Sequence, residues 1–214
     1  MHPVNGSRAP QVVALAMTGA SGAPYGLRLL QQLLAAECQV YLLLSKAAEI
    51  VIRTETDCPL PEGVAAQGEY LAAQFKARPG QLVIFDREDW FAPVASGSSF
   101  PAAMVICPAS GGTLSSIASG ASNNLIERAA DVALKERRQL ILVPREAPYS
   151  AIHLENMLKL TRMGAVVLPA SPGFYQKPRS IDDLVDFVVA RILDQLGLPQ
   201  TLLPRWGEVS RSIE

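Results

Sequence analysis

The sequence predicts an α/β fold, in which a doubly wound, mainly parallel sheet has helices on both faces and forms a single domain. The first observation is a set of short apolar runs, at 12–17, 40–44, 82–85, 103–107, 140–143 and 165–168. The second is their continuity, because apolar runs without alternation are typical of parallel strands buried on both faces. The third is the helical pattern between the runs, since alternating strands and helices build such sheets.

Helix signals occur between and after these runs. Apolar residues recur with a helical period over 181–196, preceded by Ser180, and Asp183 completes an approximate capping box. Asn124 and Glu127 form a second cap-like pair, which predicts that another helix begins there.

Length and composition fit one globular domain. The chain has 214 residues, of which 49% are hydrophobic and 18% charged, which argues against disorder. A formal net charge of -1 disfavours a nucleic-acid partner and leaves anionic small molecules open. We expect a flexible N-terminal tail at 1–10, a folded domain at 11–197 that Gly197 closes, and a C-terminal tail at 198–214.

The cysteines and histidines indicate neither a disulfide scaffold nor a metal site. Cys38, Cys58 and Cys107 are odd in number and widely spaced, and we identify no secretory signal. His2 and His153 do not cluster with them, so no metal is expected. No apolar run approaches the roughly 18 residues of a membrane span, so we expect a cytoplasmic protein.

Small and hydroxyl-bearing residues follow the first and fourth strands, at the sheet edge where open α/β folds bind ligands. The first loop, TGASGAPYG, contains Gly19, Ala20 and Ser21, and the other reads PASGGTLS from Pro108. Each leads into a helix, whose free N–H groups and positive dipole end suit a phosphate. The sequence therefore predicts a phosphate site at these loops, with a plain glycine turn as the alternative for the first.

The glycine spacing favours a mononucleotide over a dinucleotide. Glycines at 19, 22 and 26 do not match the G-x-G-x-x-G fingerprint. The second strand ends in Ser45 and Lys46, with no acid for a ribose hydroxyl. FMN is therefore favoured over NAD, while Lys46 keeps NADP open as a minor alternative.

Two charged residues follow the fifth strand. Arg145 and Glu146 come directly after a buried run and lie between Pro144 and Pro148. A surface ion pair is one explanation. We favour a ligand-binding role, because the pair falls at the same sheet edge as the two loops.

Several segments resemble the UbiX-type flavin prenyltransferases, the bacterial relatives of the fungal Pad-type proteins. They are TGASGAPYGLRLL, ASGS, NLIERAADVALKERR, LVPREAP, HLENMLKL, PGFYQKPRS and LPRWGE. The resemblance implies a Rossmann-like flavoprotein that transfers a dimethylallyl group from dimethylallyl phosphate to N5 and C6 of reduced FMN, without a metal. The prenylated FMN would serve a UbiD-type decarboxylase in the ubiquinone precursor pathway, and the enzyme would be a homo-oligomer, a dodecamer.

The resemblance also implies three sets of site residues, divided by what they would contact. The flavin would contact Gly19, Ala20, Ser21, Ser45, Ser110, Gly111, Gly112, Thr113 and Arg145. The substrate phosphate would contact Ser96, Gly97, Arg128, Lys135, Tyr175 and Arg191. The catalytic set would be Ser21, Glu55, Glu146 and Trp206. In this family the pocket lies between subunits, so some of these residues would come from a neighbouring chain.

Prenyl transfer suits these residue types. Loss of phosphate leaves an allylic cation, so cationic side chains would hold the phosphate and an aromatic face, Trp206 or Tyr175, would lie beside the cation. Glu146 would handle the proton on the phosphate side and Ser21 the proton at flavin N5, with Glu55 as a weaker candidate.

Two other functions stay open at this point. An FMN-dependent cysteine-type decarboxylase would have a loop resembling PASANT, where this chain reads PASGGT. A non-catalytic FMN carrier would have no need of Glu146, Arg128 or Lys135. The acids at 182–186 spell DDxxD, the magnesium motif of isoprenyl diphosphate synthases, but acids in the first turns of a capped helix explain it without a metal.

Overall fold

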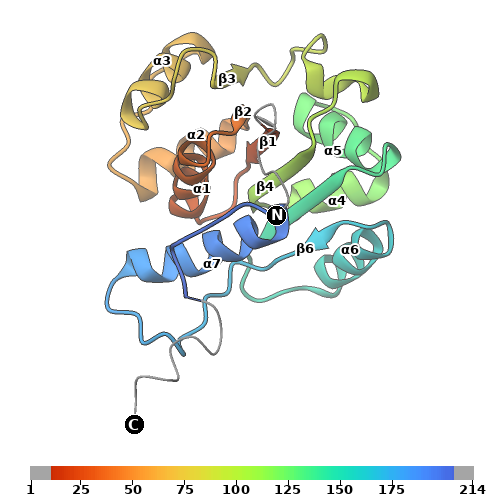
Figure 1. The fold of residues 1–214 in the computed structure, drawn as a ribbon. Helices are drawn as coiled ribbons and strands as arrows, with labels where there is room; N and C mark the ends of the chain where they lie inside the picture. The colour runs from red at the N-terminus through yellow and green to blue at the C-terminus, as the bar shows by residue number, and fades with distance from the viewer. Residues whose placement is uncertain (1–10, 205–214) are drawn as a thin grey trace, which may run out of the picture.

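The computed structural model describes residues 11–204, which are built around a six-stranded sheet (Figure 1). Its strands are β1 (Val12–Met17), β2 (Gln39–Leu44), β3 (Leu82–Phe85), β4 (Ala103–Ala109), β5 (Gln139–Pro144) and β6 (Val166–Val167). All neighbours pair in parallel, in the order β3-β2-β1-β4-β5-β6. From β1 the chain adds strands toward one edge of the sheet, up to β3, and from β4 it adds them toward the other edge, up to β6. The strand order therefore reverses between β1 and β4, and ligands of doubly wound sheets bind at such a point.

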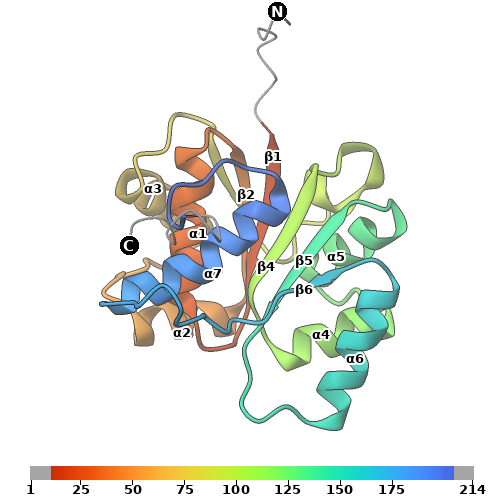
Figure 2. The ribbon, with the colours of Figure 1, turned by 60° about the horizontal axis from the view of Figure 1, so that its bottom comes forward.

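Helices form a layer on each face of the sheet (Figure 2). One layer contains α1 (Ala23–Ala35), α2 (Lys46–Glu55), α3 (Val64–Gln74) and α7 (Ile181–Leu196). The other contains α4 (Gly111–Ser119), α5 (Leu125–Lys135) and α6 (Ala151–Arg162). Two short 3-10 helices, η1 (Pro93–Ala95) and η2 (Gly97–Ser99), precede β4. The predicted single α/β domain, with helices on both faces, is confirmed.

The predicted helix caps are also present. The Ser180 hydroxyl accepts the Asp183 N–H, and the Asp183 carboxylate accepts the Ser180 N–H, so α7 begins with a full capping box. Gly197 follows α7 with a φ of 68° and terminates it. The Asn124 side chain accepts the Glu127 N–H at the start of α5.

The two edge strands depart from the prediction. Continuous apolar runs predicted burial on both faces, which is wrong for β3 and β6, whose residues are only half-buried. β6 is also shorter than the predicted run at 165–168. Both strands have a neighbour on one side only, so less of their surface is covered.

α1 approaches β4 closely at Gly26. A Cβ at this position would lie 2.5 Å from the carbonyl oxygen of Cys107 and 2.5 Å from the Cε of Met17. Only a hydrogen fits there, so Gly26 sets how near α1 lies to the strands at the point where the winding changes.

Gly26→Ala is expected to destabilise the fold by about 1–3 kcal/mol, because the added methyl group meets a main-chain carbonyl that cannot move freely. The matched control is Gly68→Ala in α3, where the nearest atom to the new Cβ is Ile84 Cγ1 at 3.9 Å. This change should stabilise the helix by about 0.5–1 kcal/mol. Urea denaturation of both variants checks the contrast, and equal effects would contradict it.

Candidate functional site

The hydroxyl of Thr18 joins the loops that follow β1 and β4. It donates a hydrogen bond to the Pro108 carbonyl at 3.0 Å and accepts one from the Ser110 N–H at 2.8 Å. The Thr18 N–H also donates to the Pro108 carbonyl, at 3.1 Å. Thr18 is 2% exposed. The two loops predicted to bind a ligand are therefore held side by side.

The loop after β4 presents main-chain donors. The Ser110 hydroxyl caps α4 by accepting the Thr113 N–H at 3.3 Å, and the two hydroxyls lie 3.0 Å apart. Gly111 and Gly112 open α4, and within residues 11–204 no group accepts their N–H groups. A Cβ at Gly111 would lie 2.7 Å from His153 Nε2. This loop is therefore an open helix N-terminus with His153 beside it.

The loop after β1 differs, because a carboxylate already occupies its helix N-terminus. Glu55 Oε2 accepts the N–H of Gly22 at 2.8 Å and the N–H of Ala23 at 2.9 Å. Glu55 also accepts a hydrogen bond from the Ser21 side chain. The expectation that the free N–H groups of this helix bind a phosphate is wrong for Gly22 and Ala23.

Arg145 completes this cluster from the end of β5. Its Nε donates to the Ser21 carbonyl at 3.1 Å. Partial burial opposes ionisation of Glu55, but the hydrogen bonds from Ser21, Gly22 and Ala23 and the charge of Arg145 outweigh it, so the pKa of Glu55 is lowered. Glu55 is therefore an ionised acceptor rather than a proton donor near neutral pH.

The remaining predicted flavin and proton-handling residues lie at the same edge of the sheet. Ser45 follows β2 and caps α2 by accepting the Ala48 N–H at 3.0 Å. A Cβ at Gly19 would lie 2.5 Å from the Cβ of Ala47, so this loop packs tightly on α2. Ala20 is buried. Glu146 is exposed, next to Arg145.

The predicted phosphate-binding residues form two separate groups. In the first, the Arg128 Nε of α5 donates to the Ala95 carbonyl at 3.1 Å, next to Ser96 and Gly97. Lys135 ends the same helix. These four residues therefore come together on the α5 side of the sheet.

The second group lies on the other face, at α7. Tyr175 and Arg191 line an open cavity of about 590 Å³, together with Phe187, Asp194, Gln200, Leu203 and Pro204. The rings of Tyr175 and Phe187 meet edge to face at 5.6 Å, and Arg191 Nη1 lies 2.7 Å from Asp194 Oδ2. Since α5 and α7 cover opposite faces (Figure 2), one chain does not bring the two groups together. Trp206 lies outside the described residues.

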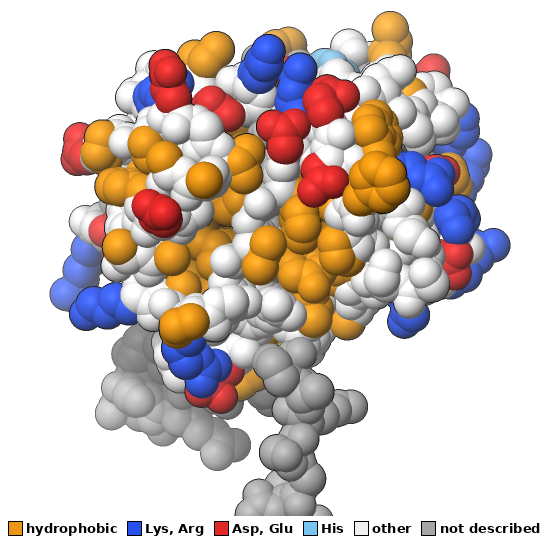
Figure 3. All heavy atoms as spheres, turned by 90° about the horizontal axis from the view of Figure 1, so that it is seen from above, with side chains coloured by type: hydrophobic (Ala, Val, Ile, Leu, Met, Phe, Trp, Pro, Cys, Tyr) orange, Lys and Arg blue, Asp and Glu red, His pale blue; other side chains and the backbone are white. Residues whose placement is uncertain are grey.

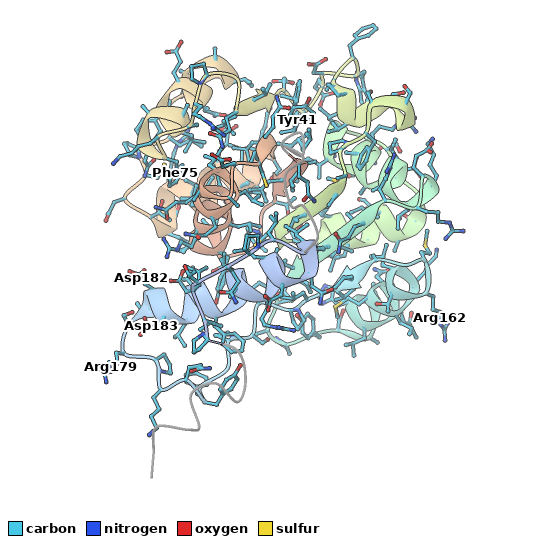
Figure 4. All side chains as sticks on the ribbon, viewed as in Figure 1. Tyr41, Phe75, Arg162, Arg179, Asp182 and Asp183 are labelled. Carbon is cyan, nitrogen blue, oxygen red and sulfur yellow. The ribbon has the colours of Figure 1, made fainter. Side chains whose placement is uncertain are left out.

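The acids of the DDxxD string have other roles. Figure 4 shows Asp182 and Asp183 at the beginning of α7. Asp183 accepts the N–H of Arg179 at 2.7 Å and forms the capping box, and Asp186 forms a bidentate ion pair with Arg28 at 2.6 and 2.9 Å. Within residues 11–204 no three His, Cys, Asp or Glu side chains are grouped as a metal site would need.

No helix between residues 11 and 204 combines the length and apolar character needed to cross a membrane.

Comparison with known proteins places this arrangement in a family. A family model described as Flavoprotein matches residues 2–193. A flavin prenyltransferase UbiX from Pseudomonas aeruginosa is 64% identical over 199 residues, which span 93% of this chain and 95% of the relative. The chain belongs to the UbiX family of flavin prenyltransferases. A UbiX from Methanocaldococcus jannaschii is 44% identical, with 92% and 99% of the two chains covered.

Solved structures agree with this membership. AnUbiX (PadA1), in complex with FMN and dimethylallyl pyrophosphate, is 41% identical with a TM-score of 0.82, covering 92% of this chain and 98% of its own. A dodecameric FMN-dependent UbiX-like decarboxylase from Escherichia coli O157:H7 is 42% identical with a TM-score of 0.79, covering 92% and 99%. The peptidyl-cysteine decarboxylase EpiD is 16% identical with a TM-score of 0.52, covering 77% and 83%, and shares the fold alone.

Two residues of the site were not predicted from the sequence, Thr18 and His153. A hydroxyl directly after a buried strand was the available signal for Thr18. His153 begins the HLENMLKL segment, but nothing in the sequence placed it beside Gly111, because α6 meets α4 only through the tertiary fold.

Thr18→Val is expected to destabilise the protein by about 1–3 kcal/mol, because the Ser110 N–H loses its acceptor inside the fold. Thr18→Ser keeps the hydroxyl and is the matched control. Urea denaturation measures both. Equal stability of the Val and Ser variants would contradict the assigned role of the hydroxyl.

Glu55→Gln is expected to destabilise the protein at neutral pH, and the difference from the wild type should shrink in acid. A lowered folded-state pKa means that the carboxylate stabilises the fold fully above the unfolded pKa of about 4.3 and loses this effect as the pH falls through the folded pKa. Denaturation between about pH 7 and pH 3 measures the trend. Glu62→Gln, at an exposed acid, is the control; a pH-independent difference for Glu55→Gln would refute the assignment.

Proposed function

We propose that the protein transfers a dimethylallyl group from dimethylallyl phosphate to N5 and C6 of reduced FMN. The observation that carries the proposal is the cluster of Ser21, Glu55 and Arg145 beside the open N-terminus of α4, in a chain of the UbiX family. The similar AnUbiX structure, described with FMN and dimethylallyl pyrophosphate, supports the same pair of ligands.

The residues present fit a flavin mononucleotide. The N–H groups of Gly111 and Gly112, at the positive end of α4, can donate to an anion or a carbonyl, and the guanidinium of Arg145 adds positive charge nearby. Ser45 and the tightly packed loop at 19–21 line the same edge. Reduced FMN, when bound, would supply the two nucleophilic positions, N5 and C6.

The side chains around this edge would then manage protons. Glu55 accepts from Ser21 and is held ionised, so it would orient the Ser21 hydroxyl toward flavin N5 rather than donate a proton itself. Glu146, which is exposed beside Arg145, would carry the proton on the side of the leaving phosphate.

The leaving phosphate would be held by residues of two chains. One chain would supply Ser96, Gly97, Arg128 and Lys135, and another would supply Tyr175 and Arg191, because α5 and α7 lie on opposite faces of the sheet. The C-terminal tail at 198–214 would contribute Trp206 as an aromatic face for the allylic cation.

A homo-oligomer follows from this division, and we propose a dodecamer, the state described for the similar E. coli protein. Large apolar side chains on the surface support such an assembly: Phe91 is fully exposed, and Ile152 and Phe174 are mostly exposed. Figure 3 shows apolar side chains among charged ones over one face. A UbiD-type decarboxylase in the ubiquinone precursor pathway would receive the product, in the cytoplasm.

The wild-type protein, incubated without oxygen with reduced FMN and dimethylallyl monophosphate or diphosphate, should convert FMN to a form heavier by one C5H8 unit, measured by mass spectrometry. Treatment with EDTA should leave the rate unchanged, since cationic side chains hold the phosphate. Unmodified FMN with both substrates would refute the proposal. Decarboxylation of a cysteine-containing peptide instead would favour the alternative reaction.

Glu146→Gln should retain FMN yet form the prenylated flavin on the order of a hundredfold to ten-thousandfold more slowly, because the amide cannot exchange a proton. Stopped anaerobic reactions measure the rate, and FMN titration measures the affinity. Glu155→Gln, at an exposed acid on α6, is the control. A wild-type rate for Glu146→Gln would move the proton transfer to the phosphate itself or to another residue.

A further inference from the structure

The segment at 93–99, which contains Ser96 and Gly97, packs on α5 at two points that are two helical turns apart. At the first, Arg128 Nε donates to the Ala95 carbonyl at 3.1 Å. At the second, the carboxylate of Glu136, the residue after α5, lies over Gly97. The two contacts fix the segment against α5 between Arg128 and Glu136.

Glu136 occupies the space that a side chain at position 97 would need. A Cβ on Gly97 would clash with Glu136 Oε1 and would lie 2.5 Å from its Cδ and 2.9 Å from its Cγ. Glycine at 97 is therefore needed for this approach, although its φ does not lie in the left-handed region.

The same oxygen of Glu136 also holds Lys135. Lys135 Nζ lies 2.6 Å from Glu136 Oε1. The hydrogen bond from Lys135, its charge and the charge of Arg138 lower the pKa of Glu136, so its carboxylate stays ionised. Oε1 of Glu136 thus lies against both the Lys135 ammonium and Gly97.

This geometry leaves the ammonium able to bind an anion. An ammonium group has three N–H donors, and Glu136 takes one of them. Lysine has a long, flexible side chain, and a partner that restrains it lowers the entropy lost when a ligand binds. The side chains of Lys135 and Glu136 are 47% and 39% exposed, so the pair contributes little to folding stability.

We propose that Glu136 is a positioning residue, which holds the Lys135 ammonium beside the Ser96–Gly97 segment so that both meet the phosphate of the allylic substrate together. The inference rests on the proposed function, in which Lys135 and this segment bind that phosphate. Glu136 itself does not touch the substrate. Because the lysine itself remains and only its restraint before binding is lost, loss of this positioning raises KM and leaves kcat nearly unchanged.

Glu136→Gln tests the role, with reduced FMN saturating and dimethylallyl monophosphate varied. The KM for the phosphate should rise by about tenfold, with kcat within about twofold and the melting temperature unchanged. Glu37→Gln is the matched control, because Glu37 is an exposed acid paired with Arg78 at 3.3 Å outside the site. A KM for Glu136→Gln equal to that of the wild type overturns the inference.

A double-mutant cycle tests the contact with Gly97. Gly97→Ala alone should raise KM as Glu136→Gln does, since the methyl group displaces the carboxylate. In a Glu136→Ala background the methyl group has room, so Gly97→Ala should raise KM by less than it does in the wild type. Additive effects of the two changes would show that they act separately and would overturn the inference.

Binding without turnover separates this inference from the proposed function. Calorimetric titration of dimethylallyl monophosphate into the complex with oxidised FMN should give a Kd about tenfold higher for Glu136→Gln than for the wild type. Equal Kd values overturn the role of Glu136. A wild-type protein that binds the phosphate, with the expected loss in Glu136→Gln, but never prenylates reduced FMN overturns the proposed reaction while Glu136 keeps its role.

Discussion

The site depends on one buried hydroxyl. Thr18 is at once donor to Pro108 and acceptor from Ser110, and through it the loop after β1 and the loop after β4 have a fixed separation. Both capacities of a buried hydroxyl are used, so neither loop can shift without leaving a polar group unpaired in the interior. Gly26 adds to this constraint, since it lets α1 lie close against β4.

Two helices begin at this point, and their positive ends are used in different ways. The N-terminus of α1 is neutralised by the Glu55 carboxylate, which is part of the protein. The N-terminus of α4 keeps two N–H groups that no described residue accepts. An anion or carbonyl would therefore be drawn to α4, while the ionised Glu55 orients Ser21 close by.

The cationic side chains of the predicted phosphate site are divided between the two faces of the sheet. Arg128, Lys135 and Arg191 each lie next to an acid on their own segment: Asp131, Glu136 and Asp194. Pairs of this kind on an exposed helix stabilise a monomer only weakly, but they restrain long side chains before a ligand arrives. Under the proposed function, a second chain would bring α7 against the α5 side, and the restrained cations of both chains would then bind the phosphate together.

The sequence alone was sufficient for the local features. Strands β1, β2, β4 and β5, the caps at Ser180 and Asn124 and the end of α7 at Gly197 all follow from period, side-chain hydrogen bonding and backbone freedom, which act over a few residues. The two loops and Arg145 could also be placed at one edge, because the carboxyl ends of parallel strands meet there.

Only the tertiary structure decided which groups meet. Glu55 lies 32 or more residues along the chain from the N–H groups it accepts, and Thr18 lies 92 residues from Ser110. His153 of α6 likewise lies against Gly111 at the start of α4. The half-burial of β3 and β6 likewise depends on their place at the sheet edges. The sequence determined the elements and the types of residue at their ends, because these depend on near neighbours. Packing between segments distant in the chain decides which carboxylate accepts the N–H groups of which helix. It also decides which cationic side chains lie on opposite faces of the sheet.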